Sequence, residues 1–339
     1  MHHLIKSTIL SFSIALTALV SAAGQEKRMA AVEFSTSYLR LQPDYESPLE
    51  TQELMGTVVE IVGESGYWRE IISPQPYKAW CTDQGLVEMS TEELKTYEAA
   101  PKVIFNDLYG HIYIRPSDKA ETLCDLVGGN ILRYVGKKGK WTQVMLPSGK
   151  TGYVQSKFLK KHKGFRSIAM GEGSAESISP ETTEAIIAQA EKLLGVPYLW
   201  GGMSAKGVDC SGLVRISHIM NGILLPRNAS QQIKCGDRVA MQVDPSYHED
   251  GSRQNPDGSY SEAFIGQMKK RVMNLQRGDL VYFGTPATDD KPMRVTHVGI
   301  YLGNNRIIHS SHRVRINSLI PGDPDYYENA HRLIAATRL

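Results

Sequence analysis

The sequence predicts an α+β protein in which two small all-β barrels precede a larger domain that mixes helices with strands. The first observation is an internal repeat: residues 54–86 align with residues 127–159 at a constant shift of 73 positions. Both copies contain short runs of alternating apolar and polar residues between glycines, which is typical of antiparallel strands joined by tight turns. The second observation is that helical spacing and alternating runs both occur after residue 180.

The repeat and the composition set the expected domain order. The first barrel is predicted at residues 24–98 and the second at residues 99–164. Residues 165–180 are rich in Gly and Ser and are predicted to be a linker. The third domain is expected to span residues 181–339, and its first helix should begin after Ser179 and end at Gly195.

The N-terminal segment has the layout of a secretory signal peptide. Lys6 precedes an apolar run over residues 9–20, which small residues follow up to Ala23. The run is short for a membrane-spanning helix, so a membrane anchor is the disfavoured alternative. We therefore predict a signal peptide at residues 1–23 and a periplasmic or extracellular protein, and no other run approaches the length of a membrane span.

Charge and cysteine content narrow the function classes. The chain has 339 residues, with 38 Lys and Arg against 36 Asp and Glu, so no nucleic-acid partner is indicated. Four cysteines are present: Cys81, Cys124, Cys210 and Cys235. If one of them is a nucleophile, the other three leave room for at most one disulfide, and the pairing stays open.

Cys210 is the candidate nucleophile. A turn-rich segment ends at Asp209-Cys210, and helical spacing of apolar residues follows up to the Asn221-Gly222 stop signal. Cys210 is thus expected at a helix N-terminus, with Asp209 as N-cap. This position is expected to lower the thiol pKa and to supply backbone amides for an oxyanion.

Two histidines are candidates for the base and the residue that orients it. His297 begins an alternating run that ends at Gly303, and His309 lies in the next run, at hairpin spacing. Neighbouring antiparallel strands can place both imidazoles on one face. The pattern therefore predicts Cys210, His297 and His309 as nucleophile, base and orienting residue.

Other readings of the same residues stay open on sequence alone. A cysteine before a helix can be a buried structural thiol, and a histidine beside a strand can simply bond to backbone. The two histidines could also bind zinc, but a zinc site needs three or four ligands and no HExxH motif is present. No metal and no cofactor are expected.

The motifs of the third domain carry a specific resemblance. They are Tyr198-x-Trp200-Gly201-Gly202, Asp209-Cys210-Ser211-Gly212, Leu225-Pro226-Arg227, Gly278-Asp279-Leu280, His297-Val298-Gly299-Ile300-Tyr301-Leu302-Gly303 and Ile308-His309-Ser310. In this order they resemble the NlpC/P60 family of papain-like cell-wall cysteine peptidases. The repeated units resemble bacterial SH3-like domains. They contain Leu39-Arg40 in the first copy and a Gly-x-Trp pattern that ends at Trp68 and at Trp141.

The whole arrangement is similar to the γ-D-glutamyl-L-diamino acid endopeptidases of the dipeptidyl-peptidase VI type. This resemblance implies cleavage of the amide bond between γ-D-Glu and meso-diaminopimelate or Lys in murein peptides that have a free N-terminal L-Ala. It implies that Glu50, with Tyr77 beside it, faces the substrate ammonium, and that Asp209 is a second anionic contact. A buried ammonium needs such a carboxylate partner.

The resemblance also implies roles for three further residues: Tyr198 supports the oxyanion, Trp200 forms a wall of the cleft, and Ser211 helps to hold the D-Glu carboxylate. Two departures from the family pattern occur. Asn228-Ala229 stands where Asp-Ser is frequent, and residues 243–268 form a longer polar insertion that is expected to be a surface loop.

Two alternative functions remain at this stage. One is a non-catalytic protein that binds the cell wall, and the other is an endopeptidase that acts on intact, crosslinked murein. A monomer is expected in either case.

Overall fold

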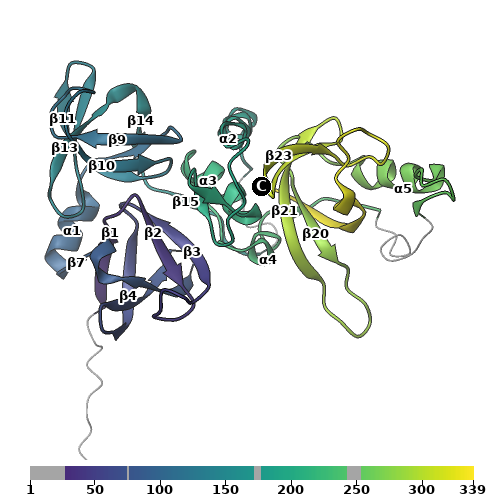
Figure 1. Cartoon of the computed structure of the whole chain (residues 1–339), viewed down its shortest axis with the longest axis horizontal. Helices are drawn as coiled ribbons and strands as arrows, with labels where there is room; N and C mark the ends of the chain where they lie inside the picture. Colours follow the sequence, from purple (N-terminus) through teal and green to yellow (C-terminus); the bar gives the residue numbers. More distant parts are fainter. Residues whose placement is uncertain (1–26, 75, 172–176, 243–252) are drawn as a thin grey trace, which may run out of the picture.

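The computed structural model describes residues 27–74, 76–171, 177–242 and 253–339. The predicted signal peptide at residues 1–23 lies outside the described residues. Two all-antiparallel β domains stand side by side at one end of the molecule, and helices α2 and α3 lie between them and the sheet of the third domain (Figure 1). The α+β class and the order of the domains are as predicted.

The first β domain is a seven-stranded antiparallel sheet with the strand order β3-β2-β6-β5-β4-β1-β7. Its strands are β1 Arg28–Val32, β2 Thr36–Arg40, β3 Leu49–Leu54, β4 Val58–Ser65, β5 Trp68–Ser73, β6 Tyr77–Thr82 and β7 Leu86–Met89, with a 3-10 turn at Asp83–Gly85 before β7. Its core contains Leu39, Ile71 and Cys81, all fully or almost fully buried.

The second β domain repeats this topology strand for strand, with the order β10-β9-β13-β12-β11-β8-β14. Its strands are β8 Lys102–Phe105, β9 Tyr109–Tyr113, β10 Thr122–Val127, β11 Ile131–Lys138, β12 Trp141–Met145, β13 Thr151–Gln155 and β14 Leu159–His162, with a 3-10 turn at Ser156–Phe158. The internal repeat inferred from the sequence is therefore a structural repeat.

Glycine and tryptophan explain why the repeat is visible in the sequence. Gly66 and Gly139 have φ of 58° and 60°, and each makes the turn that joins two neighbouring strands of its domain. The left-handed conformation favours glycine at this position. Trp68 and Trp141 begin the following strand and are buried in both copies. Helix α1 (Thr91–Ala99), capped by Ser90, connects the two domains.

The third domain places its helices against a six-stranded sheet with the order β19-β24-β20-β21-β22-β23. The strands are β19 Asp237–Arg238, β20 Leu280–Thr285, β21 Arg294–Gly303, β22 Arg306–Ser311, β23 Arg313–Ser318 and β24 Leu333–Arg338. The helices are α2 Pro180–Lys192, α3 Cys210–Ile219, α4 Ala229–Gln232 and α5 Glu262–Val272. A short hairpin of β16 Met203–Ser204 and β17 Gly207–Val208 precedes α3, and a 3-10 turn at Glu328–Arg332 precedes β24. Helix α3 packs against β21 and β22 in the main hydrophobic core.

Two segments differ from their predicted state. In the predicted linker, β15 Arg166–Ser167 pairs in parallel with β18 Ile223–Leu224 of the third domain, and Ile168 is buried. In the predicted polar loop at residues 243–268, α5 begins at Glu262 and buries Phe264 and Met268 in a second core. Both departures come from apolar side chains that find distant partners, which the local polar composition does not reveal.

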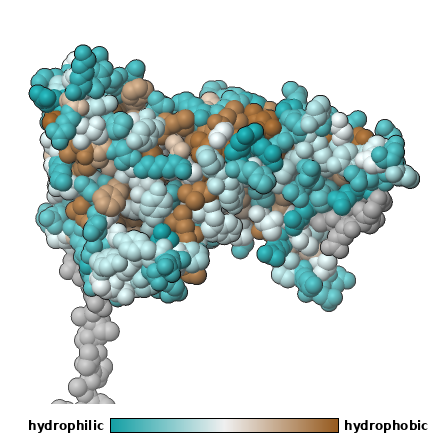
Figure 2. Space-filling model, in the orientation of Figure 1, coloured by the Kyte–Doolittle hydropathy of each residue, from teal (hydrophilic) through white to brown (hydrophobic). Residues whose placement is uncertain are grey.

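Specific side chains join the three domains. Lys206, in the hairpin before α3, donates to Asp125 Oδ2 of the second β domain (2.8 Å) and to Ser35 Oγ of the first (3.1 Å). Gln52 Oε1 in β3 accepts from the Met203 N–H (2.7 Å). Hydrophobic surface gathers over the middle of the molecule, where the β domains meet the third domain, whereas the end around α5 is mostly hydrophilic (Figure 2). Within the described ranges, no helix is long and apolar enough to cross a membrane.

Candidate active site

Helix α3 begins at Cys210, as predicted, and Asp209 caps it. Asp209 Oδ1 accepts from the Gly212 N–H at 2.7 Å, which satisfies one of the unpaired amides of the first turn. The start of the helix lies tightly against Gly202: a Cβ at Gly212 would approach the Gly202 carbonyl oxygen to 2.0 Å. Glycine is therefore required two residues after the nucleophile.

The Cys210 thiol does not have the lowered pKa that its helix position predicts. Burial raises the pKa to about 11, and Asp209 adds to this effect, whereas the N–H groups of Val298 and Ser211 oppose it. Only 8% of the residue is exposed, so the loss of hydration outweighs the helix terminus. The N–H of Val298 belongs to the residue after His297, which places the sulfur beside β21.

The two predicted imidazoles lie against each other. His297 Nε2 and His309 Nδ1 are 2.8 Å apart, within hydrogen-bond distance. Strands β21 and β22 pair Ile300 with Ile308, and continuing this register places Gly299 opposite His309. A Cβ added at Gly299 would lie 3.1 Å from His309 Cβ. Because glycine has no side chain, there is room for the diagonal contact between the two rings.

Burial keeps both imidazoles neutral. Burial, together with the neighbouring His309 and Arg315, lowers the pKa of His297 to about 3. It lowers the pKa of His309 to about 4, although the hydrogen bond to Asn317 opposes the change. A neutral His297 can accept a proton, which a general base must do.

Three groups beyond the predicted set hold the imidazoles. His309 Nε2 lies 3.0 Å from Asn317 Oδ1, and Asn317 Nδ2 donates to the Asp325 carbonyl at 2.7 Å. The Tyr327 ring packs edge-on against His309, with ring centroids 4.5 Å apart, and also contacts His297.

Asp209 and Ser211 belong to a buried network centred on Arg227. Arg227 Nη2 donates to Asp209 Oδ2 (2.5 Å), and Nη1 donates to Asp209 Oδ1 (3.1 Å) and Ser211 Oγ (2.9 Å). Asp209 Oδ2 also accepts from the Gly201 N–H at 3.0 Å. Both oxygens of Asp209 are thus occupied by partners within the protein.

Glu50 and Tyr77 meet on the first β domain, as the resemblance implies. Tyr77 Oη donates to Glu50 Oε2 at 2.6 Å, and burial, followed by this bond, raises the pKa of Tyr77 to about 12. The backbone of Glu50 borders the third domain, because a Cβ at Gly201 would lie 3.0 Å from Glu50 C. The pair therefore sits next to the segment that leads to the nucleophile.

Tyr198 and Trp200 lie in that same segment. The pKa of Tyr198 is raised by burial and then by Cys210 and Asp209, so its hydroxyl is near the thiol and stays protonated. The Tyr198 N–H donates to the His312 carbonyl at 2.9 Å, which ties the segment to the turn between β22 and β23. Trp200 is 66% exposed and is available to contact a ligand.

The remaining candidates are accounted for as follows. Cys81, Cys124, Cys210 and Cys235 are all free thiols. Among the described residues, no group of three or more His, Cys, Asp or Glu side chains could hold a metal ion.

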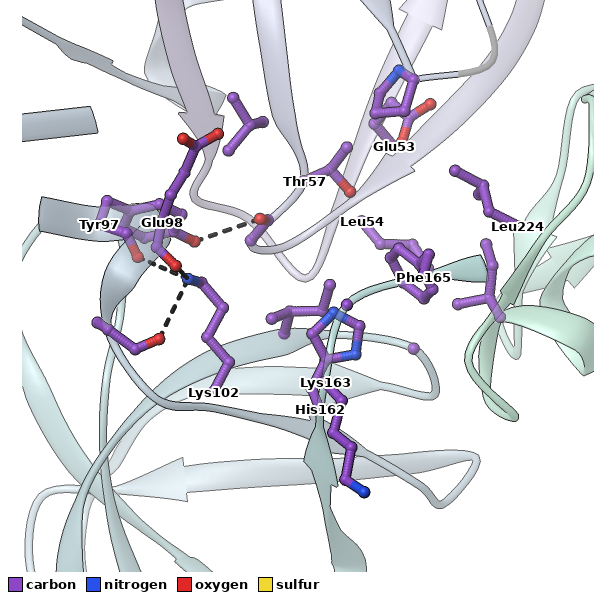
Figure 3. A pocket seen from close by; sticks show the side chains of 18 of the residues that line it. Glu53, Leu54, Thr57, Tyr97, Glu98, Lys102, His162, Lys163, Phe165 and Leu224 are labelled. Carbon is purple, nitrogen blue, oxygen red and sulfur yellow. Dashed lines mark hydrogen bonds between the residues drawn. The ribbon is translucent and has the colours of Figure 1, made fainter. Parts of the chain in front are cut away.

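A cavity of about 520 Å³ lies where the three domains meet (Figure 3), lined by residues such as Glu53, Lys102 and Phe165. No predicted site residue lines this cavity, so it is separate from the thiol.

Sequence reasoning assigned no role to Arg227, Asn317 or Tyr327. Arg227 was visible as part of a motif, but its partner Thr51 is 176 positions away. Asn317 could have been noticed, because alternation in the strand after His309 puts Arg313, Arg315 and Asn317 on one face. Nothing local marks Tyr327.

Comparisons with known proteins agree with this geometry. The NlpC/P60 family profile matches residues 195–329. The chain is 28% identical to a γ-D-glutamyl-L-lysine dipeptidyl-peptidase of Bacillus cereus over 83% of this chain and 73% of that protein. It is 24% identical to dipeptidyl-peptidase 6 of Lysinibacillus sphaericus over 88% of this chain and 94% of that protein.

A solved structure extends the similarity to the fold. The crystal structure of an NlpC/P60 family protein from Bacillus cereus has a TM-score of 0.65 at 20% identity, covering 91% of this chain and 99% of that one. The likeness therefore includes the two β domains as well as the third domain.

Proposed function

Because this chain is an NlpC/P60 cysteine peptidase related to γ-D-glutamyl-L-lysine dipeptidyl-peptidases over most of its length, we propose that it cleaves murein stem peptides. The bond is the amide between γ-D-Glu and Lys or meso-diaminopimelate, in peptides with a free N-terminal L-Ala. The observation that carries the proposal is the 2.8 Å contact between His297 and His309 beside a thiol at the start of α3.

In the proposed reaction, Cys210 attacks the amide carbonyl while His297 takes the thiol proton. Both groups are neutral at rest, since burial raises the thiol pKa and lowers the imidazole pKa, so proton transfer accompanies the attack. His297 then gives the proton to the leaving amine, which releases the diamino acid. Water cleaves the resulting thioester with His297 as base, and His309 orients His297 throughout.

The oxyanion of each tetrahedral intermediate needs donors that are already in position. The first-turn amides of α3 and the protonated hydroxyl of Tyr198 are the candidates. The exposed ring of Trp200 is proposed to contact the substrate peptide, and Ser211 to help hold the D-Glu carboxylate.

Selectivity for a free amine is proposed to rest mainly on Glu50. Its carboxylate has Tyr77 as hydrogen-bond partner, whereas both oxygens of Asp209 bond to Arg227 and to backbone amides. Asp209 is therefore proposed as a weaker, second contact for the ammonium. A charge-assisted hydrogen bond to Glu50 contributes about 1.5–3 kcal/mol.

A peptide-cleavage assay with mass detection tests the proposal. L-Ala-γ-D-Glu-L-Lys and its meso-diaminopimelate counterpart are expected to be cleaved, and their N-acetylated forms much less. Cys210→Ala should abolish cleavage of all four peptides. Equal cleavage of free and acetylated peptides would support the endopeptidase alternative, and no cleavage of any peptide or of intact murein would support the wall-binding alternative.

Export and oligomeric state complete the proposal. Residues 1–23 are proposed to direct export to the periplasm or the cell exterior and then to be removed; N-terminal sequencing of the secreted protein tests this. The protein is proposed to act as a monomer, and light scattering measures its oligomeric state.

A further inference from the structure

We propose that Asn317 sets the tautomers of both active-site imidazoles and thereby leaves Nδ1 of His297 free to accept a proton. Asn317 is a positioning residue in this scheme, because it touches His309 and not the substrate. The inference rests on the proposed function insofar as it assigns His297 as the base.

The side-chain amide of Asn317 can face its two neighbours in one orientation only. Its Nδ2 lies 2.7 Å from the carbonyl oxygen of Asp325, which can only accept a hydrogen bond. The amide NH₂ must therefore face Asp325. Its Oδ1, which can only accept, must then face His309.

The Asp325 carbonyl is itself held in place. It also accepts from the Ser318 N–H at 3.1 Å, and the Asp325 carboxylate forms an ion pair with Arg306 in β22. The loop after β23 is thus tied to the strand that carries His309. The orientation of the Asn317 amide is consequently determined by backbone and not by the histidines.

The orientation of the Asn317 amide determines the tautomer of His309. Asn317 Oδ1 lies 3.0 Å from His309 Nε2, so Nε2 must carry the hydrogen. His309 is fully buried and burial lowers its pKa to about 4, so the ring is neutral and has one hydrogen only. Its Nδ1 therefore presents a lone pair.

The tautomer of His309 in turn determines the tautomer of His297. His309 Nδ1 lies 2.8 Å from His297 Nε2, and the lone pair on the former requires the hydrogen to be on the latter. His297 is neutral as well, because burial lowers its pKa to about 3. Its one hydrogen is then on Nε2, and Nδ1 is left as the acceptor for the Cys210 proton.

Sheet geometry explains why Asn317 occupies this position. In the β22–β23 pair, His309 is opposite Arg315 and Ile307 is opposite Asn317, so Asn317 is the diagonal neighbour of His309. Diagonal neighbours on one face are within reach of long or planar side chains. His309 thus has a diagonal partner on each side, His297 in β21 and Asn317 in β23.

Two variants separate tautomer control from simple structural support. Asn317→Leu has nearly the same shape but removes the acceptor for His309 and the donor to Asp325. Asn317→Asp keeps an acceptor for His309 but adds a negative charge and loses the donor. The matched control is Asn274→Leu, which removes a 3.0 Å hydrogen bond from an asparagine amide to the Ala240 carbonyl away from the site.

The measurements are imidazole ¹⁵N NMR of the free enzyme, and kcat and KM on the free-amine peptide. In the wild type, we expect both rings to be neutral with the hydrogen on Nε2. In Asn317→Leu, we expect a mixture of tautomers at His309 and a kcat lower by about 10- to 100-fold with little change in KM, by analogy with the outer partners that orient metal-binding histidines.

Asn317→Asp should keep the Nε2–H tautomer, since the carboxylate also accepts, but should raise the pKa of His309. The groups that face His309 and influence this titration are His297 and Arg315, with the Tyr327 ring packed against the imidazole. A protonated His309 has no lone pair for His297. At high pH, the kcat/KM of this variant is therefore expected to approach the wild-type value. As the solution becomes acidic, its kcat/KM should begin to decrease at a higher pH than that of the wild type.

The proposal is overturned if wild-type His309 carries its hydrogen on Nδ1. It is also overturned if Asn317→Leu keeps the single Nε2–H tautomer, whatever its activity, because the residue would then be structural only. If the wild type cleaves no murein peptide, the proposed function fails, but the NMR spectra of the wild type and of Asn317→Leu still decide the role of Asn317.

Discussion

Arg227 of the third domain donates from Nε to Thr51 Oγ1 in β3 of the first β domain, at 2.7 Å. The same guanidinium holds both oxygens of Asp209, the residue that caps the nucleophile helix. The strand that carries Glu50 and the helix that carries Cys210 are thus fixed to one buried cation.

Replacement of Arg227 by Met is expected to destabilise the protein strongly. Only 1% of Arg227 is exposed, and its removal leaves the Asp209 carboxylate buried without a counterion. Such a loss costs about 3–5 kcal/mol, whereas Thr51→Val, which removes one bond, should cost about 1.5–3 kcal/mol. Urea unfolding measures both values, and a cost for Arg227→Met no greater than that for Thr51→Val would contradict the central role of this cation.

Replacement of Glu50 by Gln should weaken recognition of a free amine. We expect kcat/KM for the free-amine peptide to decline by about 10- to 100-fold, equivalent to a charge-assisted bond of about 1.5–3 kcal/mol, with no change for the N-acetylated peptide. Glu46→Gln is a suitable control, because Glu46 is an exposed acid of the loop before β3. An unchanged ratio between the two peptides in Glu50→Gln would assign amine recognition to another residue.

Replacement of Gly299 by Ala should displace His309. The new Cβ would lie 3.1 Å from both His309 Cβ and the Ile308 carbonyl oxygen, which is backbone and cannot move aside easily. We expect a stability loss of about 1–3 kcal/mol and a lower kcat. Gly266→Ala in α5 is the control: nothing lies within 4 Å of the new Cβ, so it should stabilise the helix by about 0.5–1 kcal/mol and leave kcat unchanged.

Stability should decrease as the pH falls below 6.5. Burial lowers the pKa of His218 to about 4 in the folded protein, so the unfolded chain binds the proton first as the solution becomes acidic. The stability that the neutral, buried His218 contributes is fully present above pH 6.5 and is lost progressively down to about pH 4. Between pH 7 and pH 5, the wild type should therefore lose about 2 kcal/mol more than His218→Asn.

Urea midpoints of the two proteins at pH 7 and pH 5 provide this comparison. Subtracting the pH-dependent change of His218→Asn from that of the wild type cancels the contributions of other groups. His297 and His309 also destabilise the protein at low pH, whereas the raised pKa of Glu53 stabilises it there. If the urea midpoints of both proteins decrease by the same amount between pH 7 and pH 5, His218 is not held neutral in the folded protein.

The thiol of Cys210 should react slowly with iodoacetamide at neutral pH. With a pKa of about 11, the thiolate fraction, and hence the alkylation rate, should rise about tenfold per pH unit between pH 8 and pH 10. Peptide mapping distinguishes Cys210 from Cys81, Cys124 and Cys235. A rate that stays constant above pH 6 would instead indicate a resting thiolate–imidazolium pair.

Local patterns in the sequence were sufficient for most of the secondary structure near the site. The cap at Asp209, the helix start at Cys210, the turn after Gly303 and the two histidines at hairpin spacing are all found as predicted. Each depends on residues within a few positions of one another. Residues 262–268 were predicted wrongly as loop, because the partners of Phe264 and Met268 are far away in the chain.

The sequence by itself determined the repeated β topology, the helix that starts at the nucleophile, and the pairing of His297 with His309, because turns, caps and strand alternation are properties of neighbouring residues. Only the tertiary structure decided that Arg227 joins Thr51 to Asp209, that Asn317 meets His309, and that the thiol pKa is raised and not lowered. These depend on burial and on contacts between distant segments, and dehydration of a charge can exceed the effect of a helix terminus.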